Sequence, residues 1–566
     1  MSYKGNGSFT CDVYIGPPGS GKTTKISSLV REAVASGANP MICSLTRTAS
    51  AEVASRDLSI PRENISTLHS HALAALDKPA LTEGNLKEWN RLYPHYSLAS
   101  GGADGSDPYA RRLDRGPDLM AKLDLMRARC VPPELWPTEL SVFAGQWQEW
   151  KDNSRYVDFT DLIELAVKKN TPIPHGCDMI FADEAQDLSE LELRLLKHWA
   201  LQAKSLTIVG DPWQSLYGWR GAHPEMFDSE SIKAGRRHVL SQSYRVPRRV
   251  HAAAIGLIKK LSCYSPIDYA PTDQEGSVRQ VEYGMSFPMP IVQEASKLAA
   301  QGRTVMIAAS CGYMLNGIIE ELRRTGEPFA NPWRTKNGRW NPLQGGRGVS
   351  MRQRIHEFMI PIEGVSHSET SNSIIDDGRT DINHLGPRSW TVKEVSRWSG
   401  ALTGVLVRGA KKYLRGTGAV GGTDHIVTLD ELNDWFDFIP ASNLASIMDG
   451  MVDQHEALAW YGDHLSRDKK KPAEAAMAIA RRHGSRRLRD APKIYVGTIH
   501  SFKGAEADTV ILIPDLSSSG FREWSGSPKA KDSVIRMFYV GMTRARRQLI
   551  LCRASTTRAA NIWETA

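Results

Sequence analysis

The stretch GPPGSGKT, from Gly16 to Thr23, decides how the first part of this 566-residue chain folds. It follows the short apolar run CDVYI (residues 11–15) and precedes TTKISSLVREAVAS (residues 23–36), whose apolar spacing predicts a helix. A glycine-rich turn of the form G-x-x-x-x-G-K-[ST] between a strand and a helix can wrap its backbone N–H groups around phosphate oxygens. The sequence therefore predicts a nucleotide phosphate site at this turn.

Two side chains of the turn carry chemistry of their own. The Lys22 ammonium is expected to reach the β- and γ-phosphates of ATP, and the Thr23 hydroxyl to bind Mg²⁺. The loop's candidate nucleotide-binding residues are Gly16, Gly19, Gly21, Lys22, Thr23 and Thr24.

Outward from the loop, short apolar runs alternate with a helical pattern. PMICSLT (40–46), DMIFADEAQD (178–187) and SLTIVGD (205–211) are strand candidates, and LSELELRLLKHWA (188–200) has the leucine spacing of an amphipathic helix. Such alternation predicts a parallel sheet that is covered on both faces. Later runs predict a second sheet of the same kind: TVMIAAS (304–310), KIYVGTIH (493–500), DTVILIPD (508–515) and RQLILCRA (547–554).

Two regions interrupt this α/β pattern. Residues 76–174 are rich in helix formers and tryptophan, and residues 331–487 carry glycine-rich pieces and a basic segment. The fold expected is therefore α/β, with two cores that are each interrupted by an insertion. The proposed boundaries are 1–75 with 175–245 for the first core, 76–174 for its helical insertion, 246–330 with 488–566 for the second core, and 331–487 for its insertion.

The run MIFADEAQD places Asp183 and Glu184 at the end of a predicted buried strand. Hard divalent cations prefer carboxylate oxygens, and ligands of open α/β sheets bind at the carboxyl ends of the strands. Asp183 is thus the candidate Mg²⁺ ligand, and Glu184 the candidate base that takes a proton from an attacking water. Taken alone, the pair also fits two solvated carboxylates in a loop. A phosphate loop alone fits kinases, GTPases and motors, and the added Asp-Glu strand favours ATP hydrolysis.

Composition places few further limits on function. The chain is 41% hydrophobic and 24% charged, and its net charge of +8 favours a polyanionic partner such as nucleic acid. The basic segment 467–490 fits a solvated helix face or a nucleic-acid contact equally well. The seven cysteines form no C-x-x-C pair, and no apolar run approaches the ~20 residues of a membrane span. We expect a soluble, cytoplasmic protein with no membrane partner.

With DEAQD (183–187) and GDPWQSLYGWRGA (210–222), the sequence resembles superfamily 1 DNA helicases of the UvrD/Rep type, which have two RecA-like cores. Further segments resemble motifs of this family in the same order, at both ends of the chain, whereas the insertions are not matched in detail. These segments are SLTRTASAEV (44–53), TLHSHA (67–72), DFTDLIELA (158–166), LSQSYRVP (240–247), GTIHSFKGAEAD (497–508) and FYVGMTRARRQL (538–549).

The resemblance implies roles at the nucleotide. Gln214 would sense the γ-phosphate and position water, Tyr244 would stack on the base, and Glu506 would bind the ribose. Arg245 and Arg544 would contact the γ-phosphate from the cleft between the cores. An arginine supplied by a second domain stabilises charge on the transferring phosphoryl group, as an arginine finger does.

The loop 210–222 places three aromatic residues among Gly, Pro and Ser. Stacking of bases on aromatic side chains holds single-stranded DNA with little sequence preference, at about 1–3 kcal/mol per base. Trp219 matches the family's stacking residue, whereas Trp213 and Tyr217 are interpreted as packing residues. The family positions that touch the DNA backbone are Thr46, His69, Thr498 and His500.

The family resemblance implies an ATP-dependent helicase that travels 3′ to 5′ on single-stranded DNA and opens single-strand/duplex junctions. A single-strand translocase that displaces bound proteins with little unwinding shares the same motor. The sequence also leaves open a nucleotide kinase, a catalytically silent DNA-binding module and an RNA substrate. The family's adenine-reading Gln before the phosphate loop has no counterpart, because the first Gln is Gln146, and we expect relaxed nucleobase selectivity.

Overall fold

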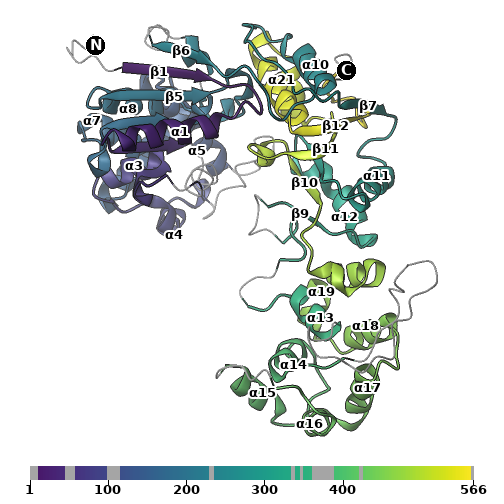
Figure 1. The fold of residues 1–566 in the computed structure, drawn as a ribbon. Helices are drawn as coiled ribbons and strands as arrows, with labels where there is room; N and C mark the ends of the chain where they lie inside the picture. Colours follow the sequence, from purple (N-terminus) through teal and green to yellow (C-terminus); the bar gives the residue numbers. More distant parts are fainter. Residues whose placement is uncertain are drawn as a thin grey trace. The chain divides into compact units, whose positions relative to one another are not determined.

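The computed structural model describes residues 10–44, 56, 58–98, 115–222, 224–228, 235–332, 338–344, 348–359, 388–419 and 425–562. Within these residues the chain forms two six-stranded sheets with parallel pairing (Figure 1). This confirms the α/β fold with two RecA-like parallel-sheet cores that was expected from the sequence. In the described part of the chain, no helix is both long enough and apolar enough to cross a membrane.

The first sheet has the order β3-β2-β4-β5-β1-β6. The predicted strand runs form its middle, and short strands that carry polar residues form its two edges. The bounds are β1 Thr10–Ile15, β2 Pro40–Ser44, β3 Ile65–Thr67, β4 Met179–Ala182, β5 Ser205–Gly210 and β6 Arg236–Val239.

Alternating side chains of these strands face opposite helical layers. Tyr14 packs with apolar residues of α1 (Lys22–Ala35), such as Ile26 and Val30. Val13 and Ile15, its neighbours in β1, pack in the core that holds α3 (Leu68–Ala75), α7 (Phe159–Lys168) and α8 (Glu190–Ala200). Helices therefore cover both faces, as the buried strand runs require.

The described part of residues 76–174 contains helices and no strand. Its α-helices are α4 (Leu86–Leu92), α5 (Arg115–Ala128), α6 (Thr138–Ser154) and α7. Edge-to-face aromatic packing forms its centre, where the Trp89 ring lies 5.9 Å from Phe143 and 4.9 Å from Trp147. This aromatic core is where the tryptophans of this stretch are used.

The second sheet has the order β7-β12-β11-β8-β10-β9. Its strands are β7 (Ser277–Val281), β8 (Val305–Ala309), β9 (Phe329–Ala330), β10 (Ile494–Thr498), β11 (Ala507–Leu512) and β12 (Ala545–Cys552). The remaining helices of this part are α10 (Arg248–Ile258), α11 (Pro288–Ala300), α12 (Asn316–Arg324), α20 (Ser518–Trp524) and α21 (Pro528–Met542).

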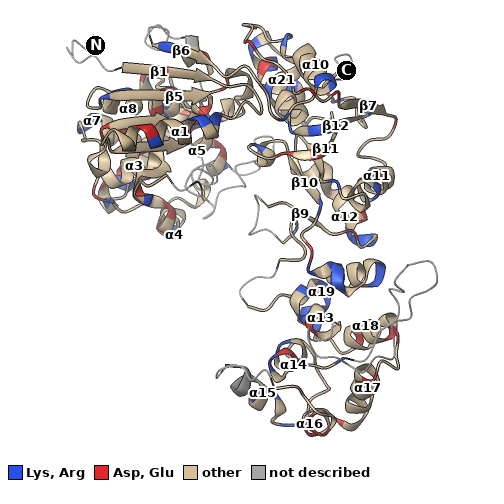
Figure 2. Cartoon of the chain, in the orientation of Figure 1, with Lys and Arg blue, Asp and Glu red and all other residues tan. Residues whose placement is uncertain are grey.

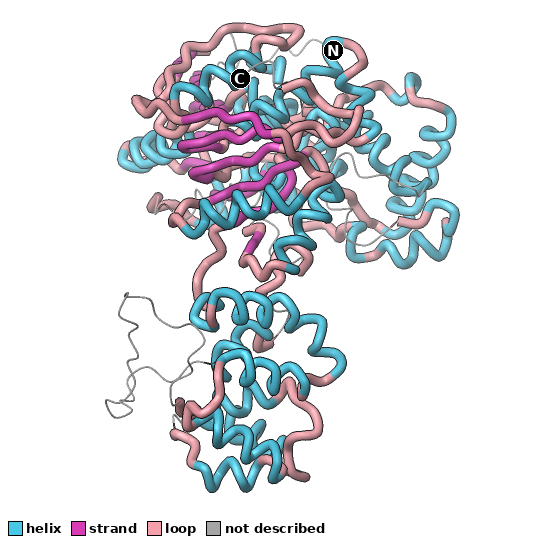
Figure 3. The backbone as a smooth tube through the Cα atoms, turned by 90° about the vertical axis from the view of Figure 1, so that its right-hand side faces the viewer, coloured by secondary structure: helices cyan, strands magenta, loops and turns pink. Residues whose placement is uncertain are grey.

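Between β9 and β10, the described residues from 348 to 490 are helix and loop (Figure 3). A core that includes Trp390, Trp398 and Tyr461 joins them. Three of the helices begin with a capping box, in which a Thr or Asp side chain and a Glu three residues later satisfy each other's backbone N–H groups. The helices are α13 (Met351–Met359), α14 (Val392–Ser399), α15 (Ala410–Ala419), α16 (Leu429–Trp435), α17 (Phe438–Met448), α18 (Gln454–Asp463) and α19 (Arg467–His483).

The chain divides into two compact units. The first comprises Met1–Gly284, Ala308–Met314 and Thr498–Ala566, and the second comprises Met285–Ile307 and Leu315–Gly497. Their boundaries differ from the four-part organisation drawn from the sequence, which stays a prediction. All of the candidate site residues belong to the first unit.

Candidate nucleotide site and nucleic-acid loop

The glycine loop joins β1 to α1 and is tightly enclosed. Gly19 and Gly21 have φ angles of 76° and 80°, in the left-handed region that favours glycine. A Cβ on Gly19 would lie 2.5 Å from Arg245 Cβ and 2.8 Å from Ser243 Oγ. The loop can therefore come this close to the 243–245 segment only because a glycine occupies position 19.

Hydrogen bonds fix the loop beside Tyr244. The Tyr244 N–H donates to Gly19 O at 2.8 Å, and Ser243 Oγ donates to Pro18 O at 2.9 Å. The Tyr244 ring is 77% exposed, and a Cβ on Gly21 would lie 4.0 Å from its Cε2. An exposed ring fixed beside a phosphate loop has the geometry that base stacking needs.

Lys22 begins α1, and its Nζ donates to Gly16 O at 2.7 Å. Thr23 is half-buried in the first turn, and the hydroxyl of exposed Thr24 accepts a hydrogen bond from Arg56 at 3.0 Å. These positions put an ammonium and two hydroxyls at the mouth of the loop.

Asp183 and Glu184 follow β4 in a sharp turn. The Asp183 side chain is buried, and its Oδ1 accepts the Glu184 N–H at 2.9 Å. Glu184 has a φ of 52°, a conformation that is uncommon for a residue other than glycine and typical of functional turns. The described residues hold no group of three or more His, Cys, Asp or Glu suited to a metal. One carboxylate and one hydroxyl fit Mg²⁺, because this ion usually takes few protein ligands together with substrate phosphates.

The Glu184 carboxylate forms an ion pair with Lys503, whose Nζ lies 3.2 Å from Oε2. Lys503 also pairs with Asp187. Burial alone would raise the pKa of Glu184, but the charges of Lys503 and Lys22 outweigh it and lower the pKa to about 2. Glu184 is therefore ionised at neutral pH.

A buried chain of hydrogen bonds joins the predicted phosphate sensor to the predicted arginine finger. Arg544 Nη2 donates to Gln214 Oε1 at 2.6 Å, and Gln214 Nε2 donates to Asp211 Oδ2 at 2.7 Å. Burial lowers the pKa of Arg544 to about 9, and the nearby charge of Arg245 acts in the same direction. The structure thus brings Gln214 and Arg544, 330 residues apart, into direct contact.

Arg245 and Glu506 also meet. Arg245 Nε donates to Glu506 Oε2 at 2.7 Å, and Arg546 lies 3.1 Å from the other carboxylate oxygen. Glu506 is partly exposed, so its carboxylate can exchange these partners.

The aromatic loop residues have different environments. Trp213 is buried and stacks on Tyr264 at 5.7 Å, in agreement with its interpretation as a packing residue. Trp219 is half-buried, and its ring lies 6.3 Å from Tyr217. The Tyr217 ring in turn lies 6.4 Å from His500. Trp219, Tyr217 and His500 therefore form a continuous row of rings.

The other residues predicted to contact the DNA backbone have environments that differ from one another. Thr498 is fully buried, and its hydroxyl accepts the Ser501 N–H at 3.2 Å. His69 lies 3.6 Å from Glu192, and burial lowers its pKa. Thr46 lies outside the described residues. The roles assigned to these side chains stay predictions.

Sequence reasoning missed several residues of the site. Asp187 and Asp211 are buried beside the predicted catalytic groups, and Lys503 contacts them with a side chain that is only partly exposed. Burial raises the pKa of Asp211 to about 6, although Lys22 and Gln214 act against this rise. Their positions in the sequence were the available signal. Asp187 ends the DEAQD segment, Asp211 is the second residue of the loop 210–222, and Lys503 lies between His500 and Glu506.

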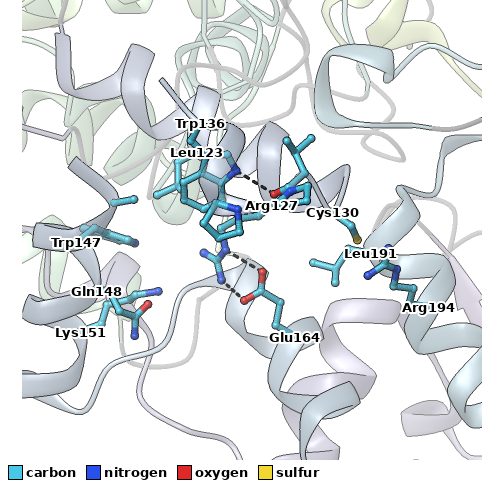
Figure 4. A pocket seen from close by; sticks show the side chains of 14 residues that line it. Leu123, Arg127, Cys130, Trp136, Trp147, Gln148, Lys151, Glu164, Leu191 and Arg194 are labelled. Atoms are coloured by element: carbon cyan, nitrogen blue, oxygen red, sulfur yellow. Dashed lines mark hydrogen bonds and ion pairs between the residues drawn. The ribbon is translucent and has the colours of Figure 1, made fainter. Parts of the chain in front are cut away.

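A cavity of about 480 Å³ between the helical insertion and α8 is lined in part by Arg127, Lys151 and Glu164, which belong to a second group of charges (Figure 4). Arg127 binds Asp158, Asp161 and Glu164, and Lys151 binds the same two aspartates at 2.7 and 2.5 Å. Arg127 and Lys151 already have carboxylate partners within the protein. We therefore interpret the cluster as a structural contact that joins α5, α6 and α7.

Comparisons with known proteins agree with this geometry. A family model described as an AAA domain matches residues 9–220, and one described as a UvrD-like helicase C-terminal domain matches residues 493–552. The chain is 23% identical to the ATP-dependent DNA helicase UvrD2 of Mycobacterium tuberculosis, over 94% of this chain and 75% of that protein. It is 34% identical to the ATP-dependent DNA helicase srs2 of Schizosaccharomyces pombe, over 25% of this chain and 17% of that protein. It is 31% identical to the ATP-dependent DNA helicase PcrA of Staphylococcus epidermidis, over 22% of this chain and 18% of that protein.

The glycine loop, the Asp-Glu turn and the two parallel sheets define a P-loop NTPase with two RecA-like cores. The matched models and relatives confirm the resemblance seen in the sequence. In its motifs and in these comparisons the chain is similar to the superfamily 1 helicases of the UvrD/Rep type.

Proposed function

We propose that the protein is an ATP-dependent DNA helicase that moves along single-stranded DNA from 3′ to 5′ and unwinds duplex at single-strand/duplex junctions. The observation that carries the proposal is the buried contact between Gln214 and Arg544. Gln214 belongs to a loop that follows a strand of the first sheet, and Arg544 follows α21. The contact lies near Glu184, which is ionised. An arginine that reaches the phosphate sensor in this way makes contact between the cores depend on the bound nucleotide.

In the proposed mechanism the glycine loop and Lys22 hold the phosphates of ATP, and Tyr244 stacks on the base. Thr23 and Asp183 would hold Mg²⁺, which when bound neutralises charge on the phosphates. Glu184 takes a proton from the attacking water, and Gln214 orients that water. Arg544, with Arg245, stabilises charge that develops on the γ-phosphoryl group.

The loop that carries Gln214 also provides the proposed contact with single-stranded DNA. Trp219 lies five residues further along this loop and offers a stacking surface to one base. A change in the position of Gln214 with phosphate state would therefore alter the grip of Trp219. Alternating grip by the two cores would move the protein along the strand.

The test is strand displacement with ATP and Mg²⁺ on duplexes that carry a 3′ or a 5′ single-stranded tail. Lys22→Ala is the inactive variant, and Lys168→Ala, an exposed lysine of α7, is the matched control. We expect unwinding of the 3′-tailed duplex alone, lost only in Lys22→Ala. DNA-stimulated ATP hydrolysis without unwinding would favour the single-strand translocase. ATP turnover unaffected by DNA would overturn the proposal.

A further inference from the structure

Lys503 lies where the nucleotide site meets the row of aromatic rings. It follows the short helical turn His500–Phe502 and precedes β11, and its side chain is 12% exposed. Its Nζ pairs with Glu184 and Asp187 and lies 3.4 Å from Gln214 O. Such a buried ammonium needs carboxylate partners, and it has two.

The ion pair occupies the group that we propose as the general base. Glu184 Oε2 accepts hydrogen bonds from both Gln186 Nε2 and Lys503 Nζ. A carboxylate oxygen offers about two lone-pair sites, so this oxygen has no site left for a water proton. While the Lys503 contact lasts, Oε2 of Glu184 is therefore not available to a water proton.

The Lys503 ammonium also contacts the loop 210–222, which carries Trp219. Lys503 Nζ lies 5.6 Å from the centre of the Tyr217 ring, in a cation–π contact. The Tyr217 ring lies 6.3 Å from Trp219 and 6.4 Å from His500, the residues predicted to touch DNA. A base that moves Trp219, or a backbone phosphate that moves His500, would therefore shift the Tyr217 ring, which Lys503 contacts.

We propose that Lys503 is a positioning residue that restrains Glu184 until single-stranded DNA binds the Trp219 loop. This inference rests on the proposed function and adds the residue that links DNA to hydrolysis. On DNA binding, movement of Tyr217 releases Lys503 from Glu184, and the ammonium stays paired with Asp187. Glu184 Oε2 then accepts the water proton, so ATP turns over faster with DNA than without it.

The experiment measures ATP hydrolysis with and without saturating single-stranded DNA for Lys503→Met and Lys503→Arg. Lys529→Met, an exposed lysine of α21, is the control. In Lys503→Met we expect the DNA-free kcat to rise by about 10-fold, part of the roughly 10²–10⁴ that a general base contributes. The KM for ATP should change less than twofold, and the stimulation by DNA should fall by the same 10-fold. Lys503→Arg should keep low DNA-free turnover.

An unchanged or lower DNA-free kcat in folded Lys503→Met would overturn the proposal, because loss of a merely structural contact does not accelerate turnover. Asp187→Asn gives a second test if that variant does not fold. This change removes the second carboxylate partner of Lys503 and leaves the amide oxygen of the new asparagine to accept the Leu216 N–H. Lys503 should then hold Glu184 more firmly, and the stimulation of ATP hydrolysis by DNA should fall. Wild-type protein whose ATP turnover ignores DNA would instead refute the proposed function.

Discussion

Two groups of buried charges in the first unit differ in how they are neutralised. In the helical insertion, Arg127 and Lys151 are bound by Asp158, Asp161 and Glu164, all within 38 residues of sequence. Burial would lower the pKa of Arg127, but its carboxylate partners outweigh this and raise it.

At the candidate nucleotide site, burial has the opposite net effect on the pKa of Arg544. Arg544 donates to a neutral amide and to the carbonyls of Val540 and Ala505, and burial lowers its pKa. A buried cation that is held by neutral acceptors suits a place where an anion comes and goes. We infer that the insertion's charges serve stability and that those of the site serve catalysis, and the following predictions test this difference.

The largest effect is expected for Arg544→Lys. Lysine keeps the charge but loses the Nη2 bond to Gln214, and the fork geometry that stabilises a phosphoryl group. DNA-stimulated kcat should fall by about 10³-fold, as for loss of an arginine finger. The melting temperature should change little, because the arginine has no carboxylate partner in the contacts described above. Arg547→Lys, exposed on β12 and three residues away, should keep activity within about twofold, and equal losses would show a general effect on the start of β12.

Lys151→Met should act on stability instead. It leaves Asp158 and Asp161 without one of their two cations in a buried place, at an expected cost of about 3–5 kcal/mol in the free energy of unfolding. Urea unfolding measures this cost, and kcat of the folded protein should stay within about threefold. The control is Lys122→Met, which breaks an exposed pair with Asp118 worth about 0–1 kcal/mol. A fall in kcat of the folded protein well beyond threefold would mean that the insertion's charges also serve catalysis, and the contrast with Arg544 would not hold.

Low pH should destabilise the ion cluster of the helical insertion over a defined pH range. Burial would raise the pKa of Asp158, but Arg127 and Lys151 outweigh it and lower the pKa from 3.8 to about 2. The ionised form therefore adds stability that is fully present above about pH 4 and is lost as the pH falls toward 2. The loss should be about 2 kcal/mol, and Asp158→Asn should flatten this part of the stability profile. An unchanged profile would exclude Asp158 as its source.

Residues close together in the sequence made the local structure around the predicted nucleotide residues predictable. The loop 16–23 and the strand that ends in Asp183-Glu184 each contain their own structural context, so strand, turn and helix could be derived together. The fold class followed from the same buried runs. The edge strands β6 and β7 were not predicted, because their sequences RRHV and SVRQV contain no apolar run.

Long-range pairing explains what the sequence could not reveal. Lys503 and Glu184 are 319 positions apart, and nothing local to GTIHSFKGAEAD indicates a carboxylate partner. Likewise the segment DFTDLIELA indicates a capped helix, but not that Arg127 and Lys151 come from two other helices to bind it. Such pairs depend on which elements the fold brings together.

A smaller effect is expected for Trp219→Ala. Loss of one stacking surface should weaken binding of single-stranded DNA by about 1–3 kcal/mol, and Trp219→Phe should recover most of it. Fluorescence anisotropy with a labelled oligonucleotide measures the affinity. Trp213→Phe is the matched control, because Trp213 packs against Tyr264 and Tyr539 and should leave DNA affinity unchanged. Equal losses in the two variants would mean that the loop as a whole, rather than the Trp219 ring, holds the base.

The smallest effect concerns the second unit, where Lys and Arg are concentrated on and after α19 (Figure 2). Residues 467–490 hold nine basic and three acidic residues, so they carry six of the chain's eight net positive charges. If these charges contact phosphates, replacing the exposed Lys470, Lys471, Arg481 and Arg486 with Gln should reduce the salt dependence of DNA binding. Each lost contact should lower the slope of log K against log salt by roughly 0.7–0.9. An unchanged slope would mean that these four side chains of α19 and the residues after it form a solvated face that does not contact phosphates, unlike the buried charges of the first unit, whose partners are fixed by the fold.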